Sequence, residues 1–165
     1  MNVLYFGTPR FAVPTLELIL GSSHTVVGVV TQPDRPRGRG QHVTASPVKQ
    51  VALAHGIPVL QPIRMKDDEW LDQVRALGAE IGVVAAYGRI LPQALLDIPP
   101  QGLINVHASL LPRWRGAAPI HRAVIAGDAV TGVTIMRVVL ALDAGPMLAT
   151  VDTPIDAGDT SETLE

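Results

Sequence analysis

Residues 2–31 have the sequence NVLYFGTPRFAVPTLELILGSSHTVVGVVT, and the hydrophobic pattern of this stretch decides the fold. The apolar runs 2–6 and 25–31 are expected to be strands. Between them, residues 11–20 have helical spacing, and Pro14 falls in the early turns, where proline is tolerated. A strand–helix–strand unit of this kind predicts a parallel sheet.

The same alternation continues along the chain. Three further strands are expected, and they are too continuously apolar for a sheet with one face in water: residues 81–86, 103–107 and 132–138. Helices are expected after Ser46-Pro47, after Asp67 or Asp68, and from about Pro119. We therefore predict a Rossmann-like α/β fold, a doubly wound and mainly parallel sheet, with the active site at the carboxyl ends of the strands that hold Ala86 and His107. Whether an antiparallel edge strand follows Met147 is left open.

Composition limits the class of protein. The chain has 165 residues, 47% of them hydrophobic and 17% charged, with a formal net charge of −2, which indicates one folded domain and not a disordered chain. There is no cysteine, which excludes disulfides and thiolate metal sites. No stretch has the pattern of a secretion signal or a membrane span. We expect a cytoplasmic monomer without a metal.

Residues 32–44, QPDRPRGRGQHVT, interrupt the alternation. Their prolines and glycines argue against regular structure, and Arg35, Arg37 and Arg39 add positive charge, so an exposed basic loop is expected. Such a loop either contacts phosphates of a nucleic acid or is simply solvated.

Residues 6–9, FGTP, lie where the first strand meets the first helix, a place where backbone N–H groups can hold an anion. The segment lacks the GxGxxG spacing of a dinucleotide site. Dinucleotide binding is therefore disfavoured.

The candidate chemistry lies in residues 103–120, LINVHASLLPRWRGAAPI. Asn105 and His107 interrupt an apolar strand two positions apart, so their side chains share one face. An amide that donates to an oxyanion and an imidazole that accepts a proton suit acyl transfer to an amine. Asp143, in a loop after the next strand, could orient the imidazole. The alternative is that Asn105 and His107 only satisfy backbone groups at a strand end.

Residues 105–120, NVHASLLPRWRGAAPI, resemble the signature of folate-dependent formyltransferases, in which the Asn, the His and a later Asp form the catalytic group. The resemblance implies that Asn105, His107 and Asp143 are catalytic and that 10-formyltetrahydrofolate is the formyl donor. Residues 142–145, LDAG, match the pattern around the family's Asp, whereas residues 138–141, VVLA, replace more polar residues.

The same resemblance implies folate contacts in two segments, namely Tyr87, Gly88, Ile90, Leu91 and Pro92, and Ser109, Leu110, Leu111 and Pro112. The first segment is a strand end followed by a turn, where Gly88 permits close backbone approach. The alternative for Ile90 and Leu91 is that they are core residues.

Three segments resemble the methionyl-tRNA formyltransferases within this family: residues 6–14, 32–40 and 114–120. This implies that methionyl-initiator tRNA is the acceptor, in translation initiation, and that Arg35, Arg37 and Arg39 bind tRNA. These enzymes also carry a C-terminal β-barrel domain that has no counterpart here, and the sequence ends at TSETLE, where Thr160 or Ser161 could cap another helix. We therefore expect residues 1–165 to be the catalytic domain, truncated at its C-terminus.

Three other activities remain open: a formyltetrahydrofolate hydrolase that passes the formyl group to water, a formyltransferase that acts on another amine such as that of a sugar, and an RNA- or nucleotide-binding module without catalysis. The shared Asn-x-His core identifies the chemistry and not the acceptor.

Overall fold

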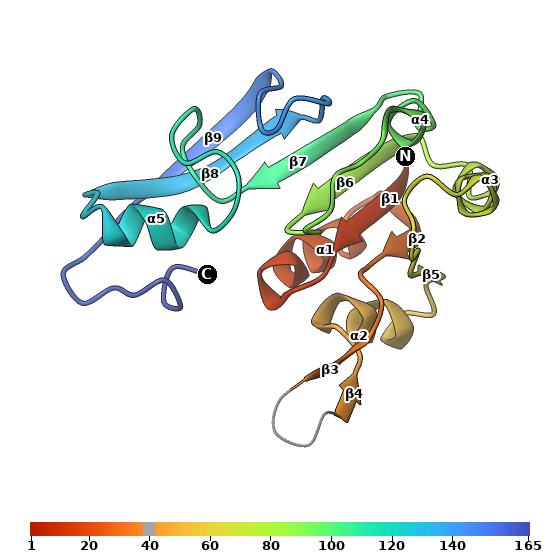
Figure 1. The fold of residues 1–165 in the computed structure, drawn as a ribbon, viewed down its shortest axis with the longest axis horizontal. Coiled ribbons are helices and arrows are strands. Elements are labelled where there is room, and N and C mark those ends of the chain that lie inside the picture. Colours follow the sequence, from red (N-terminus) through yellow and green to blue (C-terminus); the bar gives the residue numbers. More distant parts are fainter. Residues whose placement is uncertain (38–41) are drawn as a thin grey trace. The chain divides into compact units, whose positions relative to one another are not determined.

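Four parallel strands form the sheet of the unit Met1–Leu103, in the order β5-β2-β1-β6 (Figure 1). They are β1 (Asn2–Gly7), β2 (Thr25–Val30), β5 (Val59–Leu60) and β6 (Ile81–Ala85). The structure, a computed structural model, describes residues 1–37 and 42–165. The central strand is β1, whose Leu4, Tyr5 and Phe6 are fully buried.

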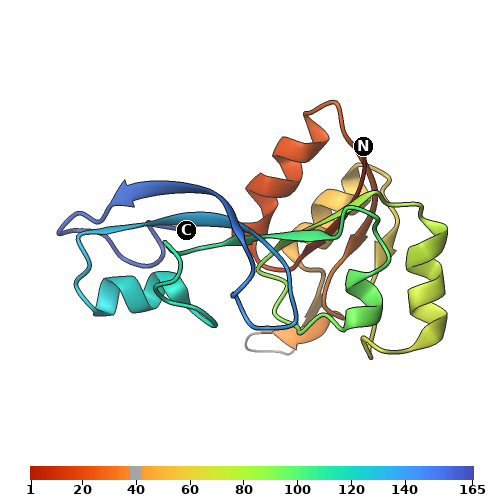
Figure 2. The same cartoon turned by 90° about the horizontal axis from the view of Figure 1, so that it is seen from above.

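Helices cover both faces of this sheet, as a doubly wound fold requires. Figure 2 shows α1 (Val13–Leu20) and α2 (Pro47–Ala54) on one side of the strands and α3 (Asp68–Ala76) on the other. The chain runs from β1 outward through β2 to β5 and then returns to β6 on the other side of β1, so the switch point of the sheet lies between β1 and β6. The predicted parallel, doubly wound α/β fold is confirmed for this unit.

The helices begin and end close to the predicted positions. A 3₁₀ turn (η1, Arg10–Ala12) precedes α1, which therefore starts two residues later than predicted. α3 buries Trp70, Leu71 and Val74, the side of the helix that its spacing predicted. The sequence did not predict α4 (Gln93–Leu96), a single turn after Pro92. Among the described helices, none is long and apolar enough to cross a membrane.

Two described parts of the basic segment are more ordered than predicted. Residues 32–44 were expected to lack regular structure, but β3 (Arg35–Arg37) and β4 (His42–Thr44) form an antiparallel ribbon with Arg35 opposite Thr44. Proline is tolerated in such a ribbon because both of its strands are edge strands, on which every second N–H points away from the partner.

The unit Ile104–Glu165 contains an antiparallel sheet in the order β7-β8-β9, which corrects the expectation that its strands are parallel. The strands are β7 (Leu103–His107), β8 (Val130–Arg137) and β9 (Met147–Pro154). β9 is exposed along its whole length, and burial in β8 nearly alternates, so this sheet is one-sided, as antiparallel sheets often are. The open question of an edge strand after Met147 is answered by β9. α5 (Pro119–Ile125) packs on β8.

The start of α2 depends on one buried hydroxyl, which gives a test of the fold. Ser46 Oγ accepts a hydrogen bond from Lys49 N at 3.1 Å and lies 2.9 Å from Thr31 Oγ1. Ser46→Ala removes both contacts, so we expect local stability at α2 to fall by about 1–2 kcal/mol, which is roughly a 5- to 30-fold increase in amide hydrogen exchange along the helix. Ser23→Ala, at an exposed position, is the control and should leave exchange within about 0.5 kcal/mol. Equal exchange in the two variants would contradict this role of Ser46.

Candidate active site

Asn105 and His107 lie two residues apart on β7, opposite Met136 and Thr134 of β8, so their side chains leave the same face of the strand. His107 is only 7% exposed, and Asn105 is partly buried. Within the part of the chain that the structure describes, the Asn105 amide has no hydrogen-bond partner, whereas His107 has two polar neighbours. The amide of Asn105 is therefore available to donate to a bound molecule.

The first neighbour of His107 is the backbone of Trp114. His107 Nε2 lies 3.0 Å from the Trp114 carbonyl oxygen. A carbonyl can only accept, so Nε2 carries a hydrogen and donates it, and in the neutral ring the lone pair is then on Nδ1. The backbone of residue 114 thus selects the tautomer of His107.

The second neighbour is the carboxylate of Asp143. Its Oδ2 lies 3.6 Å from His107 Nδ1, which is too long for a hydrogen bond but within ion-pair distance if the ring becomes charged. The same oxygen accepts a hydrogen bond of 2.8 Å from Gly116 N, and the Asp143 side chain is 12% exposed. The backbone of Asp143 is left-handed, with φ of 44°, a conformation that Asp tolerates better than most residues.

These contacts place Nδ1, the ring nitrogen without a hydrogen, beside the Asp143 carboxylate in a site with little solvent. The three residues predicted as catalytic therefore lie in one unit, where His107 and Asp143 are paired and Asn105 shares the strand face of His107.

The predicted folate segment Ser109–Pro112 is held against β8. Thr134 Oγ1 donates to Ser109 O at 2.7 Å and accepts from Leu111 N at 3.1 Å. Ser109 Oγ donates to Arg113 O at 2.6 Å. Ser109 and Leu111 are buried, Leu110 is half-buried and Pro112 is exposed. The segment is therefore held in place by hydrogen bonds, and Pro112 is its position most open to a ligand.

The other predicted folate segment divides into core and exposed residues. Tyr87 is 1% exposed, packs edge-on against Phe6 at 5.7 Å and donates to Met65 Sδ at 3.3 Å, and its burial raises the pKa of its hydroxyl. Leu91 is buried and Pro92 half-buried, whereas Ile90 is 81% exposed and Gly88 is exposed. The alternative that Ile90 and Leu91 are core residues is therefore correct for Leu91 and wrong for Ile90.

A pocket of about 280 Å³ lies in the first unit where β1, β2 and β6 end. Its polar walls come from Thr8, Gln32, Asp34 and Ser46. Gln32 Nε2 donates to Tyr87 O at 2.8 Å, and a Cβ on Gly88 would lie 2.8 Å from that same nitrogen, so Gly88 lets the two segments approach. The sequence pointed to residues 6–9 only as a place where backbone N–H groups can hold an anion, and it gave no role to Gln32, Asp34 or Ser46.

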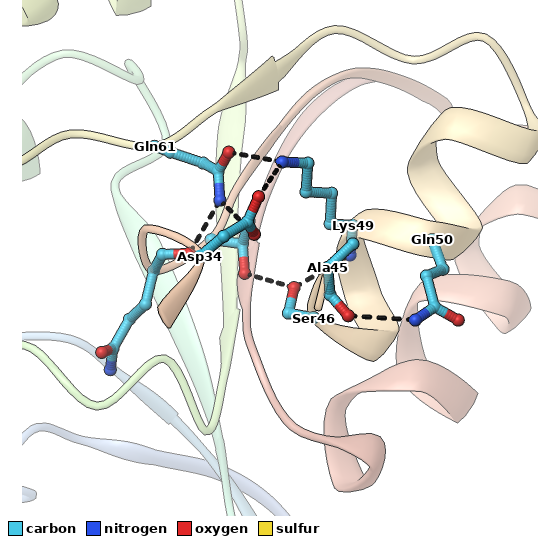
Figure 3. Close-up of polar contacts among 8 residues, drawn as sticks. Asp34, Ala45, Ser46, Lys49, Gln50 and Gln61 are labelled. Atoms are coloured by element: carbon cyan, nitrogen blue, oxygen red, sulfur yellow. Dashed lines mark hydrogen bonds and ion pairs between the residues drawn. The ribbon is translucent and has the colours of Figure 1, made fainter. Parts of the chain in front are cut away.

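The basic ribbon is anchored at its base by a polar network (Figure 3). Lys49 Nζ binds Asp34 Oδ2 and also donates to Gln61 Oε1 at 2.8 Å. Gln61 Nε2 donates to Asp34 Oδ1 and to Gln32 O, both at 2.9 Å. The hydrogen bond from Lys49 holds the pKa of Asp34 below its usual value. Of the predicted tRNA contacts, Arg35 is exposed, Arg37 belongs to β3, and Arg39 lies outside the described residues.

Sequence reasoning missed the groups that orient the predicted base. The Trp114 carbonyl and the Gly116 N–H are backbone atoms, and no residue pattern identifies them. Sequence reasoning also missed Asp128, whose carboxylate accepts from Trp114 Nε1 at 2.7 Å and from Arg113. Among residues 1–37 and 42–165 no cluster of His, Asp and Glu could hold a metal ion.

Curated proteins similar to this chain are named methionyl-tRNA formyltransferase. That of Pseudomonas fluorescens is 58% identical over 164 residues, which is 99% of this chain and 52% of the relative. That of Hydrogenovibrio crunogenus is 55% identical, over 99% of this chain and 53% of the relative. The chain spans about half the length of the curated relatives it matches.

Two similar solved structures and a matching family model are also named for the chemistry of formyl groups. A phosphoribosylglycinamide formyltransferase from Bacillus halodurans superposes with a TM-score of 0.81 at 26% identity, over 99% of this chain and 85% of that one. A formyltetrahydrofolate deformylase from Pseudomonas syringae gives 0.76 at 26% identity, over 99% of this chain and 54% of that one. The model described as "Formyl transferase" matches residues 1–165. With its whole length covered by that model, the chain belongs to the formyl transferase family.

Proposed function

We propose that this protein transfers the formyl group of 10-formyltetrahydrofolate to the amino group of methionyl-initiator tRNA. The observation that carries the chemistry is the His107 ring, held between the Trp114 carbonyl and the Asp143 carboxylate on the strand that also carries Asn105. The acceptor is supported by the names of relatives that are 54–58% identical over 99% of the chain. The fold does not distinguish one acceptor from another, because solved structures that are named for a different acceptor or for deformylation also superpose well.

The reaction begins when the amine nitrogen attacks the formyl carbon of the donor. A carbon–nitrogen bond forms, and the carbonyl oxygen becomes an oxyanion that accepts a hydrogen bond from the Asn105 amide. His107 Nδ1 takes a proton from the attacking amine, directly or through one water, and the resulting imidazolium is paired with Asp143. No covalent bond to the protein is needed.

The second half of the reaction returns this proton. As the tetrahedral intermediate collapses, the bond between the formyl carbon and N10 of the folate breaks, and the imidazolium protonates that leaving nitrogen. The products are formyl-methionyl-tRNA and tetrahydrofolate, and His107 is neutral again. One residue thus acts first as base and then as acid.

The remaining assignments follow from this proposal. The donor would contact Tyr87, Gly88, Ile90, Leu91 and Pro92, and Ser109, Leu110, Leu111 and Pro112. The exposed side chain of Ile90 and the exposed Pro112 suit an apolar ring contact, whereas the buried Tyr87 and Leu91 would act through their backbone or by shaping the turn. Arg35, Arg37 and Arg39 would contact tRNA phosphates.

The acceptor is tested by competition between amines. We expect the full-length protein, supplied with 10-formyltetrahydrofolate, to formylate methionyl-initiator tRNA with a kcat/KM at least about 10³-fold above that for phosphoribosylglycinamide or an amino sugar, because only the tRNA uses the basic ribbon. Isotope-labelled formyl transfer measures all three acceptors and release of formate to water. A faster reaction with a small amine or with water would contradict the tRNA assignment.

The catalytic roles are tested by single substitutions in the same assay. His107→Ala removes the base and should lower kcat by about 10²- to 10⁴-fold, and Asn105→Ala removes the oxyanion donor and should lower kcat by about 10²-fold, with KM for the donor nearly unchanged. His55→Ala, at an exposed position on the end of α2, is the matched control. The assignment of His107 is wrong if its alanine variant keeps near-normal kcat at saturating substrates.

The basic ribbon is tested through salt dependence. Replacing Arg35, Arg37 and Arg39 with Gln should weaken tRNA binding and reduce the slope of log Kd against log salt by about 0.7–0.9 for each phosphate that the protein no longer neutralises. Donor affinity should not change. Replacing Arg64, Lys66 and Arg75, all exposed elsewhere in the first unit, makes the same change in net charge and should leave the slope nearly intact. Equal effects of the two triple variants would show that the ribbon does not contact tRNA.

A further inference from the structure

One short segment supplies both groups that orient the His107–Asp143 pair. The carbonyl of Trp114 accepts from His107 Nε2, and two residues later the N–H of Gly116 donates to Asp143 Oδ2. Both contacts use backbone atoms, so they depend on the path of residues 113–116 and not on the identity of their side chains. Whatever fixes this path also fixes the pair.

The path of this segment is one that the chain does not adopt without support. Trp114 has a φ of 59° and Gly116 a φ of 83°, both in the left-handed region. Glycine adopts this region readily, but a bulky residue such as tryptophan does so only when its surroundings enforce it. The side chains of Trp114 or of its neighbours in the chain are therefore expected to be anchored.

The anchor is the carboxylate of Asp128. Its Oδ2 accepts from Trp114 Nε1 at 2.7 Å and from Arg113 Nε at 2.9 Å, and its Oδ1 accepts from Arg113 Nη2 at 2.6 Å. The Arg113 guanidinium also lies 4.3 Å over the centre of the Trp114 ring, so the two side chains are held together as well as to Asp128. The hydrogen bonds from Arg113 and Trp114 lower the pKa of Asp128 to about 2, and the carboxylate stays charged at any working pH.

Asp128 is itself fixed in place by the end of α5. Gly127, with a φ of 68°, ends the helix, and the Asp128 N–H donates to Ala123 O at 3.0 Å. The Asp128 side chain is 15% exposed. The end of the helix thus presents one carboxylate to the side chains of Trp114, which carries the carbonyl, and of Arg113, the residue before it.

We propose that Asp128 is a positioning residue for the base. By holding the Trp114 indole and the Arg113 guanidinium, it keeps the Trp114 carbonyl against His107 Nε2 and so selects Nδ1 as the nitrogen that accepts the amine proton. This role rests on the proposed formyl transfer. In this role Asp128 acts through Trp114 and Arg113 and not on the reacting atoms.

The consequence of removing this anchor follows from imidazole chemistry. Without the Trp114 carbonyl, nothing requires the hydrogen to stay on Nε2, and the tautomer with hydrogen on Nδ1 would donate it toward Asp143. The lone pair would then be on Nε2, away from the carboxylate that pairs with the charged ring. A fraction of the enzyme would hold the base in an unproductive form, and kcat would fall by that fraction.

The test uses two variants of the full-length protein. Trp114→Phe keeps the ring and its stacking with Arg113 but deletes the N–H that binds Asp128. Asp128→Asn keeps the shape but removes the charge and one acceptor from the Arg113 fork. The control is Asp72→Asn. Asp72 forms an exposed ion pair with Arg75 on α3, so this variant also removes the carboxylate of an ion pair, but in the first unit.

Two readouts separate positioning from a merely structural role. Long-range ¹H–¹⁵N spectra of the imidazole report the tautomer directly, and we expect Nε2–H to dominate in the wild-type protein and in Asp72→Asn, and a mixture of tautomers in both site variants. In the formyl-transfer assay, kcat of the site variants should fall in proportion to the share of the ring that the spectra report with its hydrogen on Nδ1, about twofold for an equal mixture and about tenfold for nine parts in ten, with KM for the donor within about twofold of wild type.

The proposal is overturned if both site variants keep the wild-type tautomer, or if only one of the two readouts changes. A lower melting temperature with native tautomer and native kcat would mean that Asp128 only stabilises the unit. Should Asp128→Asn fail to fold, Trp114→Phe decides alone. If the wild-type protein formylated no acceptor, the proposed function would fail, yet the spectra would still report whether Asp128 sets the tautomer.

Discussion

The hydrogen bond from His107 Nε2 to the Trp114 carbonyl is the contact on which the candidate site depends. It converts an imidazole that could accept a proton on either nitrogen into one that accepts on Nδ1, where the Asp143 carboxylate is 3.6 Å away. The antiparallel register of β7 and β8 places Thr134 opposite His107. The Thr134 hydroxyl bonds to the backbone of both Ser109 and Leu111 and so holds the segment that follows β7. The strand, the segment after it and the loop of Asp143 are thus parts of one hydrogen-bonded arrangement.

The two units differ in how their sheets are buried and in where their polar groups lie. The first buries its sheet on both faces under helices, which gives a rigid frame, and its strand ends carry a polar pocket and a basic ribbon that the Asp34–Lys49–Gln61 network anchors. The second is a one-sided antiparallel sheet, and its chemistry comes from loops with left-handed residues at Trp114, Ala118 and Asp143. Such backbone is costly, and it persists where hydrogen bonds such as those to Asp128 and from Gly116 hold it.

Sequence predicted those features that depend on local pattern. Apolar runs and capping residues predicted the parallel sheet, and Ser46 and Pro47 begin α2 as expected. Two-residue spacing predicted that Asn105 and His107 share a face, and resemblance added Asp143. The antiparallel direction of β8 and the ribbon of β3 and β4 were not predicted, because strand direction and pairing are set by tertiary contacts that a hydrophobic pattern does not encode. The Trp114 carbonyl, the Gly116 N–H and Asp128 were missed for a related reason: every residue has the first two groups, and an acid after a helix end is ordinarily a solvated one.

Formyl transfer centred on the His107–Asp143 pair is tested most directly by the single-turnover rate of Asp143→Asn at saturating donor and tRNA. Asparagine can still accept the Gly116 hydrogen bond, so the loop is preserved while the charge that pairs with the imidazolium is removed. We expect a single-turnover rate at least about 10²-fold below wild type, with unchanged affinity for both substrates. A wild-type rate in this variant would show that the His107–Asp143 pair is not the centre of formyl transfer.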